Sequence, residues 1–111
     1  MSADSYTAGP TDPPLIEETI DANFRATVAA HPDREALVVR HQGVRWSYTE
    51  LDAEIDRLAR ALLASGLAVG DRVALWSPNR FEWVLAQYAT ARIGVIICLL
   101  YTSDAADDSL R

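Results

Sequence analysis

The sequence contains no lysine: all ten of its basic residues are arginines, and sixteen Asp and Glu residues give a formal net charge of −6 over 111 residues. Enzymes that hold phosphate groups or form Schiff bases commonly use a lysine ammonium, so this chain by itself carries no lysine-dependent step. Nucleic-acid binding needs clustered positive charge that displaces counterions from phosphates. The acidic balance therefore predicts no nucleic-acid partner.

Cysteine and histidine are scarce as well. Cys98 stands alone, which excludes an internal disulfide, and His31 and His41 are too few to complete a Cys/His zinc site. We therefore expect no metal site in this chain. The lone cysteine also fits a cytoplasmic protein, which is the location that the sequence predicts.

Long apolar runs are absent too. The longest, residues 95–100, falls far short of the roughly 18 apolar residues that a membrane-spanning helix needs, so no transmembrane segment is expected. Residues 1–11 are small and polar, with no basic start and no apolar stretch, which argues against a signal peptide. Half of all residues are hydrophobic and 23% are charged, proportions typical of an ordinary globular domain.

Proline marks the first boundary in the chain. Residues 1–18 are predicted to form a flexible N-terminal lead, because Pro10, Pro13 and Pro14 each remove a backbone donor. A helix is expected to begin after Thr19, whose hydroxyl can cap it. It should end before Pro32, because the residue that precedes a proline is pushed out of the helical region.

A hairpin and a long helix are expected next. Two short apolar stretches, residues 35–41 and 44–46, flank a Gln-Gly pair, which predicts a β-hairpin with a two-residue turn. Ser47 and Glu50 then stand at the spacing of a capping box. The amphipathic run that follows predicts a helix of about five turns, with an apolar stripe of Leu51, Ile55, Leu58 and Leu62.

The remaining elements predict a parallel sheet. Residues 72–76 are an apolar-rich run with the character of a strand covered on both faces. A second helix is expected over residues 80–93, followed by a strand over residues 95–97. Because a strand, a helix and a strand in this order form a parallel pair with a crossover, the predicted fold class is α/β.

Residues 98–111 do not match the rest of the chain. They read CLLYTSDAADDSLR and show no capping, turn or amphipathic pattern. Residues 98–107 can be back-translated into DNA that resembles the transposon-end adapter of sequencing libraries. We therefore interpret residues 98–111 as a non-native, adapter-like tail and exclude them from fold prediction.

Several phrases of the chain carry a family resemblance. They are REALVV at residues 34–39, SYTEL at 47–51, GLAVGDRVAL at 66–75, SPN at 77–79, WVLAQ at 83–87 and ATARIG at 89–94. In this order they resemble the N-terminal part of the AMP-forming acyl-CoA synthetases, within the adenylate-forming superfamily, and are most similar to the fatty-acyl-CoA ligases. The resemblance covers residues 19–97. It implies the truncated start of the AMP-binding N-terminal domain, an incomplete portion of the large domain.

The resemblance implies a parent enzyme that uses ATP and Mg²⁺ to convert a small-molecule carboxylate, a medium- or long-chain fatty acid, into an acyl-adenylate. CoA would then take the acyl group as a thioester. A carboxylate is a poor acyl donor at neutral pH, and a phosphate leaving group makes thioester formation feasible. Two alternatives stay open: an amino-acid-activating adenylation domain of a peptide synthetase, and a genuine small, non-catalytic binding module.

No catalytic, cofactor-binding or metal-binding residue of the family can be assigned to this chain, and the fragment alone is expected to be inactive. The family's phosphate loop, its magnesium-associated glutamate, its ribose-binding aspartate and its catalytic lysine belong to later segments. The five glycines of this chain are too scattered to cradle a phosphate.

The polar and aromatic residues that stand out all receive structural interpretations. Ser47 and Glu50 are expected to cap a helix, His31 to meet the negative end of one, and His41 to be solvated. The acidic residues of the long helix are expected to line a solvated face, and the later aromatic residues to pack in the core. These are Asp52, Glu54 and Asp56, and Trp76, Phe81, Trp83 and Tyr88.

Overall fold

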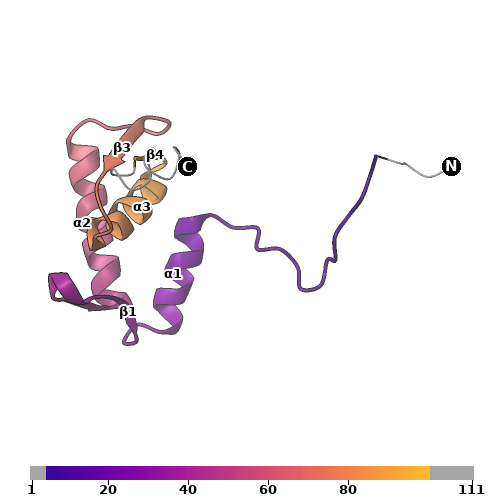
Figure 1. Ribbon diagram of the computed structural model, residues 1–111, viewed down its shortest axis with the longest axis horizontal. Helices are drawn as coiled ribbons and strands as arrows, with labels where there is room; N and C mark the ends of the chain where they lie inside the picture. The colour runs from indigo at the N-terminus through magenta and orange to yellow at the C-terminus, as the bar shows by residue number, and fades with distance from the viewer. Residues whose placement is uncertain (1–4, 101–111) are drawn as a thin grey trace, which may run out of the picture.

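The computed structural model describes residues 5–100 (Figure 1). In chain order the elements are α1 (Ile20–Ala30), β1 (Glu35–Val39), the short 3-10 helix η1 (Arg40–Gln42), β2 (Val44–Ser47), α2 (Tyr48–Ala64), β3 (Arg72–Trp76), α3 (Phe81–Ile93) and β4 (Ile96–Leu100). Helices, an antiparallel hairpin and a parallel strand pair confirm the predicted α/β class. Residues 5–19 run away from these elements (Figure 1).

Helix α1 begins and ends where the sequence predicts. The Thr19 hydroxyl accepts a hydrogen bond from the backbone N–H of Ala22 at 3.0 Å, which satisfies one of the free donors of the first turn. At the other end the His31 N–H donates to the Thr27 carbonyl, and Pro32 follows. The one buried residue of this helix is Phe24.

The hairpin forms, but its turn differs from the predicted two-residue connection. Strands β1 and β2 pair antiparallel from Val39 opposite Val44 outward, with an irregularity between Glu35 and Leu37. The connection between them is η1 followed by Gly43, whose φ of +68° is the left-handed conformation that glycine favours. One side chain of η1, Gln42, also contacts the start of α3.

Both ends of α2 confirm the prediction. The Ser47 hydroxyl accepts from the Glu50 N–H at 3.2 Å, and the Glu50 carboxylate accepts from the Ser47 N–H at 2.9 Å, forming a capping box. At the C-terminal end Gly66 has a φ of +104°, and the N–H of Leu67 reaches back to the Leu62 carbonyl at 3.4 Å. This is the hydrogen-bond pattern of a Schellman motif.

The parallel pair is confirmed, with two corrections. Strand β4 begins at Ile96 and continues to Leu100, whereas the sequence predicts a strand over residues 95–97. In β3, Val73 and Leu75 are half-buried while the alternate residues are exposed, so residues 5–100 cover only one of the two faces that the sequence predicts to be covered. The described residues provide a helical layer for one face only.

The apolar core lies where α2 and α3 meet. Phe24, Leu51, Ile55, Ala59, Leu85 and Ala89 form its buried cluster. The predicted stripe of α2 is therefore right in its first two residues, while Leu58 and Leu62 pack against the cluster from partly exposed positions. Ala59 of α2 is also buried in this cluster. A small side chain at such a position allows two helices to approach closely.

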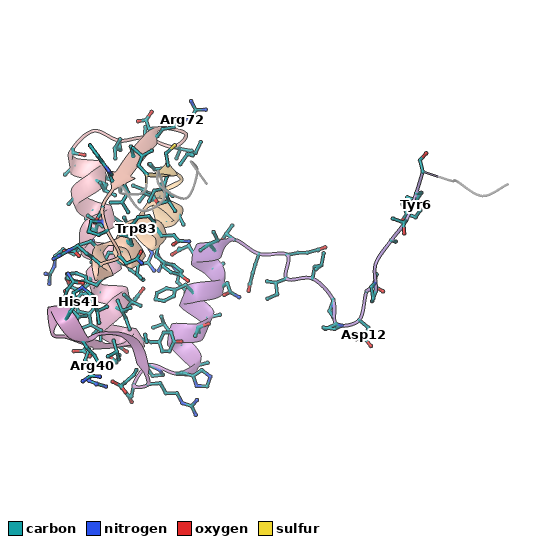
Figure 2. All side chains as sticks on the ribbon, in the orientation of Figure 1. Tyr6, Asp12, Arg40, His41, Arg72 and Trp83 are labelled. Atoms are coloured by element: carbon teal, nitrogen blue, oxygen red, sulfur yellow. The ribbon has the colours of Figure 1, made fainter. Side chains whose placement is uncertain are left out.

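The hairpin and the parallel pair occupy opposite ends of the described fold. Figure 2 shows Arg40 and His41 at the hairpin end and Arg72 at the other, with α2 running between them. Residues 101–111, most of the tail that the sequence analysis sets apart, lie outside the described residues.

Candidate functional site

The structure does not gather the polar residues that the sequence singles out. Ser47 and Glu50 are engaged with each other at the start of α2. His31 and His41 are both exposed, one at the end of α1 and the other on η1. Across residues 5–100 no group of three His, Cys, Asp or Glu side chains is placed to hold a metal ion.

The aromatic residues have separate environments. Phe81 packs edge-on against Trp46, with ring centroids 5.2 Å apart, and Tyr88 packs against Phe24. The indole N–H of Trp83 donates to the Ser77 carbonyl at 3.0 Å. Trp76 is 76% exposed, so its predicted place in the core is wrong within the described fold. Its position on the open face of β3 is the reason.

A cavity of 330 Å³ lies where α1, β1, α2 and α3 converge. Its walls combine apolar side chains with a few uncharged polar groups. The residues that line it are Asn23, Phe24, Thr27, Ala36, Leu37, Tyr48, Leu51, Val84 and Tyr88. Concave sites of this size with an apolar lining and a small number of polar groups are typical of small-molecule binding.

Phe24 contacts both of the other aromatic rings of the cavity. Phe24 lies with its ring centroid 4.9 Å from Tyr88 and 6.3 Å from Tyr48, and its plane is tilted by 43° and 48° to theirs. Each of the three rings comes from a different helix. The cavity is therefore shaped by the same aromatic contacts that hold α1 against α2 and α3.

A buried arginine joins the same three helices on another side. Arg92 of α3 is only 6% exposed, and its Nε donates to Asp21 of α1 at 2.6 Å. Its Nη2 donates to Asp52 of α2 at 2.7 Å. Asp21 also accepts from Arg25, one turn later on α1, at 2.7 Å. The planar guanidinium thus binds two carboxylates with separate nitrogens, which a lysine ammonium could not reproduce.

The ionisation of this cluster follows from these contacts. Partial burial by itself raises the pKa of Asp21, but hydrogen bonds from Arg25 and Arg92 outweigh it and hold the pKa below its ordinary value. Burial likewise disfavours the charged form of Arg92, yet Asp21 and Asp52 raise its pKa further above its ordinary value. Asp21 and Arg92 are therefore both charged near neutral pH, and their ion pair acts as a structural clamp between α1 and α3.

No local pattern of residues predicts this clamp. Asp21 and Arg92 are 71 residues apart in the sequence. From its neighbours alone, Asp21 is interpreted as an acidic residue in the first turn of a helix. Asp52 reads as a member of a solvated face, and the structure corrects that interpretation, because this carboxylate is 34% exposed and paired with Arg92. Glu54 and Asp56 do pair locally with Arg57 and Arg60 on the surface of α2.

A second contact between distant segments fixes the start of α3. Arg80 provides no side-chain cap for this helix. Instead, Oε1 of Gln42 on η1 accepts from the Phe81 N–H at 2.8 Å, and its Nε2 donates to Glu82 at 3.1 Å. This hydrogen bond from Gln42 lowers the pKa of Glu82 and outweighs the opposing effect of burial. The hairpin turn thereby caps a helix that begins 39 residues later.

The chain is similar in sequence to proteins of known family. The chain is 44% identical over 93 residues to the medium-chain acyl-CoA ligase ACSF2, mitochondrial, of Danio rerio, an alignment that covers 84% of this chain and 15% of that protein. The chain thus spans about one seventh of the length of this relative. No helix within residues 5–100 is long and apolar enough to cross a membrane.

Solved structures show the same arrangement of elements. The inhibitor-bound N-terminal domain of FACL13 from Mycobacterium tuberculosis superposes with a TM-score of 0.75 at 32% identity, over 84% of this chain and 23% of that one. The N-terminal subdomain of NpsA from Klebsiella oxytoca gives 0.72 at 25% identity, over 77% and 22%. A sequence model of the AMP-binding enzymes matches residues 24–109. The chain belongs to the family of AMP-binding enzymes.

Proposed function

We propose that this chain is part of an ATP-dependent acyl-CoA ligase that activates a medium- or long-chain fatty acid through an acyl-adenylate and transfers it to CoA. The observation that carries the proposal is the 44% identity to a medium-chain acyl-CoA ligase across 84% of this chain. The likeness to FACL13 at a TM-score of 0.75 supports the same class of fold. The substrate and the acceptor belong to the proposed parent protein.

The described residues do not fit ATP, Mg²⁺ or CoA. They contain no cluster of acidic residues placed for a metal ion, and the sequence has neither a lysine nor closely spaced glycines that could hold a phosphate. We therefore propose that the catalytic and cofactor-binding residues lie in other segments of the parent. In this proposal the chain alone is inactive and contributes a frame of helices and strands.

An activity assay on the parent tests the proposal. The full-length protein encoded at the source locus is incubated with ATP, Mg²⁺, CoA and fatty acids of increasing chain length. Formation of the thioester together with AMP and pyrophosphate is the expected outcome, with the 111-residue chain as the inactive control. A full-length protein that makes no acyl-adenylate from any fatty acid would contradict the proposal.

An amino-acid-activating enzyme is the second candidate, because the chain also resembles NpsA, which has been solved in complex with 3-hydroxyanthranilyl-AMSN. Such an enzyme would load a phosphopantetheine carrier in place of CoA. Amino-acid-dependent exchange of pyrophosphate into ATP, with no CoA thioester formed, would favour this candidate. Saturable ATP binding by the 111-residue chain alone would instead favour a small independent module.

The division of the chain is also a proposal. We infer a flexible lead over residues 1–18, the start of the AMP-binding domain over residues 19–97 and an adapter-like tail over residues 98–111. Strand β4 continues to Leu100 and the family match to residue 109, so the origin of the tail stays a prediction. Resequencing the source DNA across codon 97 without a transposon adapter tests it: a reading frame that diverges after Ile97 supports an artefact, and an unchanged one contradicts it.

The cytoplasmic location predicted from the sequence is likewise kept as a proposal. ACSF2 of Danio rerio carries the description mitochondrial, which applies to that protein. Fractionation of cells of the source organism, followed by detection of the full-length protein, distinguishes a cytoplasmic location from a compartment or membrane fraction.

A further inference from the structure

The cavity between α1, β1, α2 and α3 is lined by apolar side chains and uncharged polar groups. Its 330 Å³ exceeds the roughly 150 Å³ of an apolar protein cavity that holds benzene. We propose that it binds a small neutral aromatic molecule with a single hydrogen-bonding group on its ring. The proposal rests on the lining of the cavity and does not depend on acyl transfer.

The charge of the lining selects a neutral ligand. None of the nine lining residues carries a charge at neutral pH. The charged groups near its α1 wall already have partners: Glu18 accepts from the Asn23 amide at 2.8 Å, and Asp21 is paired with Arg25 and Arg92. An ionised ligand would lose its hydration on entering the cavity and would find no opposite charge there. Such a transfer has a strongly unfavourable free energy.

The aromatic side chains select a flat ring. Phe24 contacts both Tyr48 and Tyr88 at centroid distances of 6.3 and 4.9 Å, in tilted arrangements. Rings of this kind pack favourably against a further ring in an offset or edge-to-face arrangement. Ala36 and Val84 complete the wall with small aliphatic groups that leave space for such a ring.

Two hydroxyl groups supply the polar contact. The Thr27 hydroxyl donates to the Asn23 backbone carbonyl at 3.2 Å and is therefore already used. Among residues 5–100, the hydroxyls of Tyr48 and Tyr88 form no side-chain hydrogen bond, and neither is an enclosed unsatisfied atom. Both residues line the cavity, and a tyrosine hydroxyl within reach of a bound ligand can donate to its carbonyl or hydroxyl oxygen.

A pair of matched probes tests the selection for charge. The 111-residue chain is titrated with benzamide and with benzoate, which share a ring and a similar size, while methyl resonances of Leu37, Leu51 and Val84 are followed by NMR. Benzamide should shift these resonances in a saturable manner, and benzoate should bind at least about tenfold more weakly. Absence of a benzamide effect at these methyls, or equal binding of both probes, overturns the proposal.

Variants of the lining test the location. The double variant Tyr48→Phe, Tyr88→Phe keeps the rings and removes both hydroxyls, so benzamide should bind about fivefold more weakly while toluene binds as before. Ala36→Leu should fill the cavity and abolish binding, with Ala53→Leu at an exposed position of α2 as its matched control. Near-UV circular dichroism checks that each variant is folded.

The tyrosine variant keeps the proposal testable if Ala36→Leu does not fold. Unchanged benzamide affinity in the tyrosine variant contradicts the polar contact and with it the proposal. Because the readout is ligand binding to this chain, it is independent of thioester formation by the full-length protein. Failure of the cavity proposal can therefore be distinguished from failure of the proposed ligase function.

Discussion

Arg92 has a role at the residue scale that no neighbouring residue can replace. Its guanidinium lies almost completely buried between Asp21 and Asp52, and each carboxylate contacts a different nitrogen. Breaking a buried ion pair by removing one partner leaves the other charges without compensation in a poorly solvated place. The stability of the helix arrangement should therefore depend strongly on this single side chain.

Replacement of Arg92 by alanine is expected to lower the free energy of unfolding by about 3–5 kcal/mol, because Asp52 then loses the guanidinium that it contacts and Asp21 keeps only Arg25. Arg92→Lys should recover only part of the loss, since one ammonium cannot repeat both contacts in the same geometry. Urea denaturation followed by circular dichroism measures both changes. Arg57→Ala, at a largely exposed pair on α2, is the control and should stay within about 0.5 kcal/mol of the unchanged chain.

Asp21 should make the stability depend on pH in the acidic range. Its pKa is lower in the folded chain than in the unfolded chain, so the unfolded state binds the proton more readily. The stabilisation is fully present above the unfolded pKa, and it is lost as the pH falls through the folded pKa, which lies below the ordinary value of an aspartate carboxyl.

Asp21→Asn should therefore flatten this part of the stability curve and cost about 1–2 kcal/mol at neutral pH. Thermal melting between acid and neutral pH, with and without the substitution, measures the difference. A variant that keeps the acid dependence of the unchanged chain would show that other carboxylates are responsible.

At the scale of secondary-structure elements, the hairpin and α3 depend on each other. Helix α3 lacks a cap from its own N-cap residue, and Gln42 of η1 supplies the acceptor for the Phe81 N–H. The left-handed Gly43 then returns the chain to β2. The hairpin turn is therefore a support for α3 as well as a connection between strands.

Gln42→Ala should reduce stability by about 1 kcal/mol, the usual cost of losing a helix cap, with an increase in amide hydrogen exchange concentrated in the first turn of α3. Arg40→Ala alters an exposed residue of the same η1 segment and serves as the control. If both variants exchange at the same rate around Phe81, the capping role of Gln42 is wrong.

At the scale of the whole molecule, one face of the parallel pair is uncovered. Trp76 is 76% exposed, and Ile96 and Leu100 are each 48% exposed on the neighbouring strand. Parallel sheets in proteins are almost always covered on both faces. This open face supports the proposal that the chain is part of a larger domain, in which other segments cover these residues.

The proposal predicts different effects of Trp76→Lys in two settings. In the 111-residue chain the change affects an exposed side chain and should alter stability by less than about 0.5 kcal/mol. In the full-length protein the same lysine would be buried against other segments and should cost about 2 kcal/mol or more. Melting temperatures of both proteins, each with and without the change, provide the comparison, and an equally small effect in both would contradict a covered face.

Local sequence signals determined the order of the elements and the ends of helices α1 and α2. Thr19 and Pro32 bound α1, and the capping box and Gly66 bound α2, because caps and breakers act within a few residues of the backbone that they satisfy. The order of elements was sufficient to predict the parallel pair of β3 and β4. These predictions need no knowledge of distant contacts.

Tertiary structure alone decided which distant residues meet. Asp21, Asp52 and Arg92 belong to three helices, and each has an ordinary local interpretation until the helices pack. The Gln42 cap of α3 and the cavity around Phe24 arise in the same way. Contacts between elements depend on how the helices approach one another, and a pattern of residues along one element carries no direct record of its partner.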